Sequence, residues 1–126
     1  MKIIKVIGVV IMVGAVVFFL NEKTNNRLLI TSETINEQDA LGRTALHNAI
    51  ADRRLNDAVA LMNNGADLDC ADNDEITPLH SAVQQHDSEA VALLLAHGAI
   101  ATRKDKNGLT PREYAKKNGN QKLIAL

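Results

Sequence analysis

The sequence is poor in aromatic residues and cysteine and carries almost no net charge. Its 126 residues include two Phe, one Tyr and no Trp, too few for the aromatic platform on which single-stranded nucleic acids stack. A formal net charge of −1 at pH 7 gives no general attraction to nucleic acid. The single cysteine, Cys70, excludes an intramolecular disulfide. We therefore expect no nucleic-acid partner, and we interpret Cys70 as a small residue of a turn.

Sequence patterns of catalytic and metal sites are missing as well. The chain has no glycine-rich phosphate loop, no nucleophile paired with a base and no carboxylate pair at ligand spacing. The acids between Asp67 and Glu75 do not follow the spacing of a calcium loop and lack its closing glutamate. These absences predict that the chain is not an enzyme and binds no cofactor and no metal.

What the sequence does contain is a repeat with a period of 33 residues. Three threonines, three aspartates and three alanines follow this spacing: Thr44, Thr77, Thr110, Asp39, Asp72, Asp105, Ala49, Ala82 and Ala115. A fixed period in this range is typical of stacked helical hairpins, in which each unit buries its apolar face on its neighbours. The repeat therefore predicts an all-α solenoid.

The repeated threonines and glycines are placed to begin and end helices. A threonine hydroxyl at an N-cap accepts from the first unpaired backbone N–H groups of a helix. Pro78 and Pro111 follow at the first helical position, where a missing N–H costs nothing. Gly65 and Gly98 mark the end of the second helix of a unit, because glycine readily adopts the left-handed conformation found there. Each unit is therefore predicted to be a helical hairpin.

This pattern resembles the ankyrin repeat. The resemblance rests on Thr-Pro-Leu-His at 77–80, Leu-Leu-Leu at 93–95 and Gly-Ala at 98–99, with a less complete copy at 39–47. Residues 108–119 are similar to a C-terminal capping repeat. The resemblance implies an ankyrin-repeat solenoid of two full repeats between degenerate N- and C-terminal capping repeats.

The chain then divides into five segments. They are a transmembrane signal-anchor at 1–22, a degenerate half-repeat at 23–38, repeat 1 at 39–71, repeat 2 at 72–104 and a C-terminal capping repeat at 105–126. Leu28 and Leu29 match the second helix of the later units, and we expect their helix to pack on the first full repeat. Arg53 and His86 replace the glycine that the family usually has between two helices, so we expect those turns to be less regular.

The N-terminal segment is dominated by one apolar run. From Val6 to Leu20 every residue is apolar or glycine, and back to Ile3 the run is interrupted only by Lys5. A helix over 3–20 is about 27 Å long, close to the roughly 30 Å hydrocarbon core of a bilayer. The run therefore predicts one transmembrane helix that contacts the lipid bilayer through residues 3–20. No small residues follow it at a signal-peptidase site, which favours an uncleaved anchor over the alternative, a cleaved signal peptide.

The flanking charges indicate the orientation of this segment. Lys2, Lys5 and the α-amino group precede the apolar run, whereas Lys23 and Arg27 follow it, with Glu22 between the run and Lys23. This bias favours a cytoplasmic N-terminus. We expect a single-pass protein of the bacterial inner membrane whose C-terminal ankyrin domain lies in the periplasm.

Four histidines are the remaining candidates for a metal site. His47 and His80 share one position of successive units, where the resemblance implies that the imidazole binds turn backbone and ties adjacent repeats together. Units stacked about 10 Å apart are too distant for these two rings to share one zinc ion. His97 precedes Gly98 at a helix end, and His86 lies in a turn. We interpret all four as structural.

The two turns between units carry opposite charges. The acidic residues of the first turn and the basic residues of the second are Asp67, Asp69, Asp72, Asp74, Glu75, Arg103, Lys104 and Lys106. Neighbouring turns of opposite sign can pair with each other, which is worth little at exposed sites. Alternatively, they form a bipolar surface that sets the register of a partner. The sequence leaves both interpretations open.

The resemblance implies that the chain recognises another protein. We expect contacts at turn and inner-helix positions that the fold does not require: Arg43, Asn48, Asp52, Asp74, Ile76, Ser81, Gln84, Gln85, Asn107 and Leu109. The predicted function is a membrane-anchored protein–protein interaction module with its partner on the extracytoplasmic side. One alternative is an immunity protein that neutralises a toxin at the membrane. Another is a structural subunit or stabiliser of an envelope complex.

Overall fold

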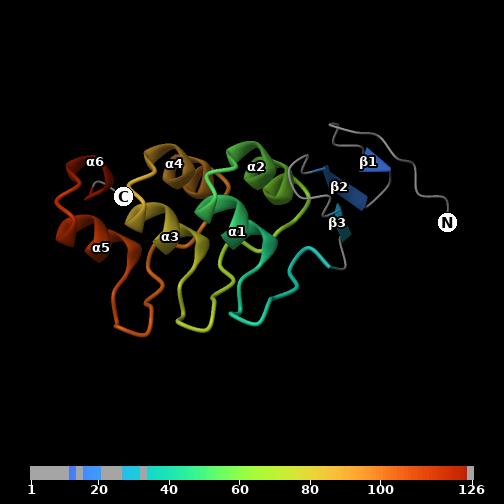
Figure 1. Ribbon diagram of the computed structural model, residues 1–126. Coiled ribbons are helices and arrows are strands. Elements are labelled where there is room, and N and C mark those ends of the chain that lie inside the picture. The colour runs from blue at the N-terminus through green and yellow to red at the C-terminus, as the bar shows by residue number, and fades with distance from the viewer. Residues whose placement is uncertain (1–11, 14–15, 21–26, 32–33, 125–126) are drawn as a thin grey trace.

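The structure, a computed structural model, describes residues 12–13, 16–20, 27–31 and 34–124. A small sheet precedes a series of helices that follow one another in pairs (Figure 1). The helices of the described residues are α1 Ala45–Ala51, α2 Leu55–Asn63, α3 Pro78–Gln84, α4 Ser88–Ala96, α5 Pro111–Lys117 and α6 Gln121–Ile124. The part of the chain predicted to be a solenoid is therefore helical, with one helical pair in each repeat.

The helices form two rows (Figure 1). α1, α3 and α5 make an inner row and α2, α4 and α6 an outer row, and each inner helix contacts the next inner helix along the chain. The turns before α1, α3 and α5 project away from the outer row. We call these turns finger 1 (38–44), finger 2 (71–77) and finger 3 (104–110). The predicted stack of helical hairpins is confirmed.

Each inner helix begins directly after its predicted N-cap. The N-caps are Thr44, Thr77 and Thr110. The sequence predicted that Glu113 would complete a capping box in the third unit, and the structure also gives this role to His47 and His80 in the first two. A neutral imidazole nitrogen can accept the N-cap backbone N–H much as a carboxylate does. The same cap geometry is thus achieved with two different side chains.

The core runs without interruption through the stack. Leu46, Ile50, Leu79 and Val83 of the inner row are fully buried. The repeated alanines are at most 1% exposed, which allows neighbouring inner helices to approach closely. Burial of each large aliphatic side chain contributes about 1.5–3 kcal/mol. Packing between units is therefore a major source of stability for these short helices.

The turns inside the units keep one geometry although their residues differ. Gly119 has φ 67°, and Arg53 and His86 at the equivalent positions have φ 56° and 57°. The expected irregularity is not observed. A residue with a Cβ adopts this left-handed conformation at a cost of about 1–2 kcal/mol. We attribute the conserved geometry to the packed helices on either side, which determine the direction of the turn.

The N-terminal strands differ from the helices predicted there. β1 Met12–Val13, β2 Val16–Leu20 and β3 Arg27–Thr31 form an antiparallel sheet in the order β1-β2-β3. The helix predictions for 16–20 and for Leu28 and Leu29 are therefore wrong. β-branched and aromatic residues such as those of β2 favour strands. An apolar run alone does not distinguish a helix from a buried strand.

The sheet lies at the end of the stack formed by the first unit, where β2 contacts α2 (Figure 1). In the described part of the chain, no helix is long and apolar enough to cross a bilayer. The remaining residues of the predicted anchor, 1–11, 14–15 and 21–22, lie outside the described residues.

Candidate protein-binding face

Each finger is built on the aspartate at its base. The Asp72 carboxylate accepts from the backbone N–H groups of Asp74 at 2.8 Å and Ile76 at 2.9 Å. Asp39 and Asp105 accept from the equivalent N–H groups of their own fingers. An aspartate that binds the backbone two residues on stabilises a tight turn. The predicted equivalence of the three aspartates is confirmed.

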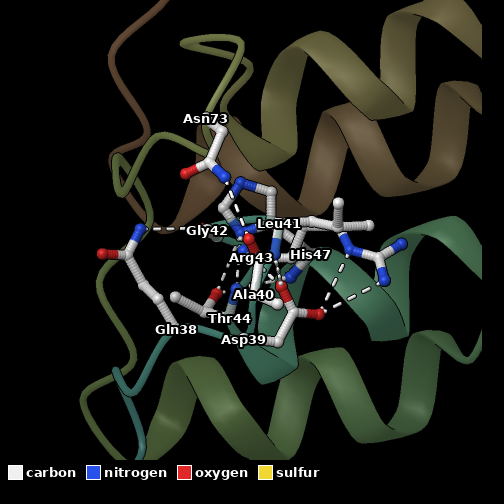
Figure 2. Close-up of polar contacts among 9 residues, drawn as sticks. All are labelled: Gln38, Asp39, Ala40, Leu41, Gly42, Arg43, Thr44, His47 and Asn73. Atoms are coloured by element: carbon white, nitrogen blue, oxygen red, sulfur yellow. Dashed lines mark hydrogen bonds and ion pairs between the residues drawn. The ribbon is translucent and has the colours of Figure 1, made fainter.

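Figure 2 shows how finger 1 holds its arginine. The Asp39 carboxylate accepts from the Arg43 backbone N–H at 3.0 Å and lies 3.2 Å from the Arg43 guanidinium. The backbone hydrogen bond from Arg43 is the main reason why the pKa of Asp39 lies below its ordinary value. Arg43, a predicted contact residue, therefore has a partner inside its own finger.

Fingers 1 and 2 are bonded to each other (Figure 2). The backbone N–H of Asn73 donates to the Leu41 carbonyl at 3.0 Å, and its side-chain amide donates to the Ala40 carbonyl at 3.0 Å. The close approach of Asn73 to finger 1 leaves no room for a side chain at Gly42, where a Cβ would lie 2.5 Å from Asn73 Oδ1. Gly42 also has φ 76°. Glycine is required here by both space and backbone conformation.

Two buried histidines connect each finger to the next. His47 Nδ1 accepts from the Thr44 N–H at 3.1 Å, and His47 Nε2 donates to the Ile76 carbonyl at 2.9 Å. An N–H only donates and a carbonyl only accepts, so the ring is neutral with its proton on Nε2. Burial lowers the pKa of His47, which also favours the neutral ring. His80 makes the equivalent bond to the Leu109 carbonyl at 3.0 Å, which confirms the predicted ties between repeats.

The third unit has an additional lock between its finger and its inner helix. The Tyr114 hydroxyl of α5 donates to the Asp105 carboxylate, and the Tyr114 ring packs edge-on against His80 with ring centroids 6.0 Å apart. Burial by itself raises the pKa of Asp105, but hydrogen bonds from Tyr114 and from the Leu109 backbone hold this pKa below its ordinary value. Asp105 is only 3% exposed, so its carboxylate is a fixed part of the finger.

Tyr114 brings together predicted residues from two units. Its hydrogen bond to Asp105 raises the pKa of the Tyr114 hydroxyl, while the side chains of Asn107 and Gln84, which also lie beside this hydroxyl, oppose the rise. Asn107 belongs to finger 3 and Gln84 to the end of α3. The structure thus places two predicted contact residues around one partly exposed tyrosine.

Tyr114 itself was missed by the sequence reasoning, which treated it only as a departure from the repeat pattern. It follows Ser81 by 33 residues and Asn48 by 66, so counting the period through the third unit would have identified it. Asn48, Ser81 and Tyr114 stand at the same position of α1, α3 and α5, and all three are partly exposed. They form one row, which we call the inner row of side chains.

The ten predicted contact residues all lie on the fingers or on the inner helices and their ends. None of them is buried: Arg43, Asn48, Asp52, Asp74, Ile76, Ser81, Gln84, Gln85, Asn107 and Leu109. Four already have polar partners inside the chain: Arg43, Asp52, Asp74 and Gln85. The side chains best placed to meet a partner are therefore Asn48, Ile76, Ser81 and Leu109, together with the Tyr114 group.

For Gln85 and Asp74, the partners inside the chain show what each side chain does in the fold. The side-chain amide of Gln85 donates to the Ala51 carbonyl at 3.2 Å, which links the end of α3 to the first unit. Among the described residues, nothing bonds the buried side-chain oxygen of Gln85. Asp74 of finger 2 lies 3.3 Å from Lys106 of finger 3. This ion pair joins the two oppositely charged turns, as one of the two interpretations predicted. It is largely exposed and contributes little to stability.

The described residues show no cluster with the composition of a metal site. Among them, no group of three or more His, Cys, Asp or Glu side chains is arranged to hold a metal ion. Cys70 is half-buried, and burial raises the pKa of its thiol. A raised pKa disfavours the reactive thiolate. The polar groups of the fingers serve chiefly to fix the backbone.

Comparisons with known proteins agree with this geometry. A family model described as ankyrin repeats (3 copies) matches residues 54–126. The chain is 35% identical over 95 residues to inversin of Gallus gallus, 31% over 94 residues to BCL-6 corepressor-like protein 1 of Homo sapiens, and 32% over 97 residues to an interferon antagonist of Vaccinia virus (strain Western Reserve).

These matches cover 75%, 75% and 77% of this chain but only 9%, 5% and 34% of the respective relatives. The similarity therefore concerns the repeats and not the relatives as whole proteins. The period, the caps, the finger ties and the family match all agree. The chain belongs to the ankyrin-repeat family.

Proposed function

We propose that this chain is a protein-binding module whose inner face contacts a partner protein. The inner face consists of the three fingers and the exposed sides of α1, α3 and α5. The observation that carries the proposal is the inner row of side chains, Asn48, Ser81 and Tyr114, which runs along three successive helices and is only partly buried. The proposal involves no catalytic step.

The inner face is held by hydrogen bonds within the chain before any partner arrives. Each finger is held by its aspartate, and the fingers are linked to one another through backbone and histidine bonds. A surface that is already ordered loses little conformational entropy on binding. Rigid fingers therefore favour recognition of a defined partner shape.

The chemistry of the face suits a mixed polar and apolar contact. Asn48 and Ser81 offer hydrogen-bonding groups, while Ile76 and Leu109 are partly exposed apolar residues of fingers 2 and 3. Tyrosine is enriched among the residues that dominate binding energy at interfaces. We therefore expect Tyr114 and the residues around it to form the strongest part of the contact.

Site-specific photo-crosslinking tests this proposal. A photoreactive amino acid replaces Ser81 on α3 in the full chain, and a matched variant carries it at Glu89, an exposed residue of the outer helix α4. Ser81 should yield a defined crosslinked protein that Glu89 does not. Equal crosslinking from both positions would contradict an inner-face site. The identity of the captured protein then separates a toxin, expected for an immunity role, from an envelope complex.

We further propose that the module is attached to a membrane and faces the periplasm. The support is the apolar run that begins at Val6, of which Val16–Leu20 forms β2, and the charges on either side of the run. Alkaline washing of bacterial membranes should leave the full-length chain in the pellet, and protease should reach the repeats only after the outer membrane is opened. Recovery of the chain in the soluble fraction would contradict the attachment.

A further inference from the structure

Positive and negative charges are segregated along the repeats. Residues 55–102 contain no Lys or Arg, and their acidic residues are Asp57, Asp67, Asp69, Asp72, Asp74, Glu75, Asp87 and Glu89. The basic residues of 103–122 are Arg103, Lys104, Lys106, Arg112, Lys116, Lys117 and Lys122, against the two acids Asp105 and Glu113. The third unit is therefore strongly basic although the whole chain is nearly neutral.

Part of this positive charge replaces apolar core residues. Leu79 and Val83 of α3 are fully buried, and the residues 33 positions later on α5 are Arg112 and Lys116. Both are exposed. They lie four residues apart and thus on one side of α5. With Lys104, which like Lys116 acts electrostatically on Glu113, they define what we call the basic end face.

The fold accounts for only part of this gathering of charge. The outer face of a terminal repeat is polar, and Lys116 lies in the last turn of α5, where the helix dipole favours a cation, but neither reason requires Arg112 or a single sign of charge. Arg112 is the second residue of α5, where the positive end of the helix dipole disfavours a cation. The Glu113 carboxylate accepts from the Thr110 backbone N–H at 2.7 Å and serves as a cap. Within the described residues, the ion pairs involve none of Lys104, Arg112 and Lys116. Among the described residues these three cations therefore form no ion pair, and the one carboxylate that Lys104 and Lys116 act on, Glu113, is already engaged as a helix cap.

We propose that the basic end face docks a carboxylate-rich segment of a partner protein. The third unit lies at the end of the stack opposite the sheet (Figure 1). The apolar run proposed for membrane attachment includes β1 and β2 of this sheet, so a bilayer held by that run would lie nearer the far end, and lipid headgroups fit less well. A second copy also fits less well, because exposed acids such as Glu75 on finger 2 and Glu89 on α4 are spread over different sides of the second unit. Arg112 and Lys116 correspond to the buried positions Leu79 and Val83 of α3 and not to the inner row of side chains, so the end face is separate from the row formed by Asn48, Ser81 and Tyr114.

The test measures binding of a short glutamate-rich peptide to the full chain, captured on a sensor through an N-terminal tag at low ionic strength. The peptide should bind, and added salt should weaken it, because exposed charges are screened. The double variant Arg112→Gln, Lys116→Gln should weaken binding about tenfold, as expected for the loss of two exposed ion pairs. A matched control, Arg53→Gln with Arg54→Gln, removes two exposed positive charges from the first unit and should have little effect.

Several outcomes would overturn the proposal. Equal weakening in both double variants would show that the peptide responds to net charge and not to the end face. Vesicles containing phosphatidylglycerol that bind the end face when the peptide does not would assign it to a membrane. Concentration-dependent self-association abolished by the Arg112 and Lys116 changes would assign it to a second copy. Absence of peptide binding would reject the proposal outright. Thermal melting of each variant is the control that establishes that the fold is kept.

Discussion

Gly42 and Gly108 have the same finger position and almost the same backbone conformation, with φ of 76° and 74°. Their surroundings differ, because a Cβ at Gly42 would lie 2.7 Å from the backbone nitrogen of Asn73, whereas a Cβ at Gly108 would meet nothing within 4 Å. The two residues therefore separate the effect of backbone conformation from the effect of close approach between fingers.

We expect Gly42→Ala to reduce the free energy of unfolding more than Gly108→Ala does. Both changes strain the backbone, but only the first forces finger 2 away, which adds about 1–3 kcal/mol. Urea unfolding followed by circular dichroism gives both values. Equal losses would mean that the contact between Gly42 and Asn73 does not constrain the fold.

Each ring nitrogen of His47 makes one buried hydrogen bond, one to finger 1 and one to finger 2, so replacing His47 affects two units. His47→Ala leaves the Thr44 N–H and the Ile76 carbonyl without their partners, which should cost about 1–3 kcal/mol. A domain whose total free energy of unfolding is about 5–15 kcal/mol will show this loss as a lower urea midpoint. The control is His97→Ala at the exposed end of α4, which should change the midpoint little. Unchanged stability in His47→Ala would reject the role as a tie.

The lowered pKa of His47 also predicts the direction of a pH effect. The folded chain keeps the ring neutral, whereas the unfolded chain takes up a proton near the ordinary value of about 6.5. Stability from this group is therefore complete above that pH and is lost as the pH falls toward the lower folded pKa. Unfolding between pH 7 and pH 5 should depend less on pH in His47→Ala than in the unchanged protein. An identical dependence would contradict the neutral ring.

At the scale of elements, α5 and finger 3 are joined by the hydrogen bond from the Tyr114 hydroxyl to the Asp105 carboxylate. The other two fingers have no tyrosine at the equivalent positions, where Asn48 and Ser81 stand. The first finger instead has Arg43 against its aspartate. The C-terminal unit, which has a short second helix, thus gains a side-chain lock of its own.

Tyr114→Phe keeps the ring and removes the bond to Asp105. We expect a loss of about 1–3 kcal/mol, because a buried carboxylate loses one of its donors. A double-mutant cycle with Asp105→Asn assigns the loss to this pair. Additive effects of the two changes in urea unfolding would show that the hydroxyl and the carboxylate do not interact.

At the scale of the whole molecule, the core extends beyond the first repeated unit. Ile35 precedes finger 1 and is only 3% exposed, and the Asn36 side chain accepts from the Asp67 backbone N–H at 2.7 Å. The segment at 34–38 therefore covers one end of the stack. This position agrees with the expected contact between a capping segment and the first repeat, although the helix expected there is not formed at 27–31.

Ile35→Ala and Ile100→Ala compare the same change at a buried and an exposed site. Removing the buried side chain of Ile35 should cost about 2–5 kcal/mol. Ile100 is 47% exposed, and its replacement should stay within about 0.5 kcal/mol. Thermal or urea unfolding measures both. Similar small effects would mean that the segment before finger 1 is only a tether.

The sequence by itself determined the helical stack, because its decisive interactions are local and recur every 33 residues. The threonine caps, the aspartate turns and the glycine at φ 96° after α4 all depend on residues within a few positions of one another. The ten predicted contact positions were chosen from the same register, as residues outside the caps and the core, and the structure leaves none of them buried.

The tertiary structure decided what depends on neighbours distant in the sequence. The histidine bonds reach 29 residues along the chain, and only the stacked units show that Tyr114 meets Asp105, Gln84 and Asn107 at one point. The strand at Val16–Leu20 is likewise set by its pairing with Arg27–Thr31. The apolar periodicity alone does not separate a strand from a helix. The β-branched and aromatic residues of β2 favour a strand only weakly, so the pairing partner decides.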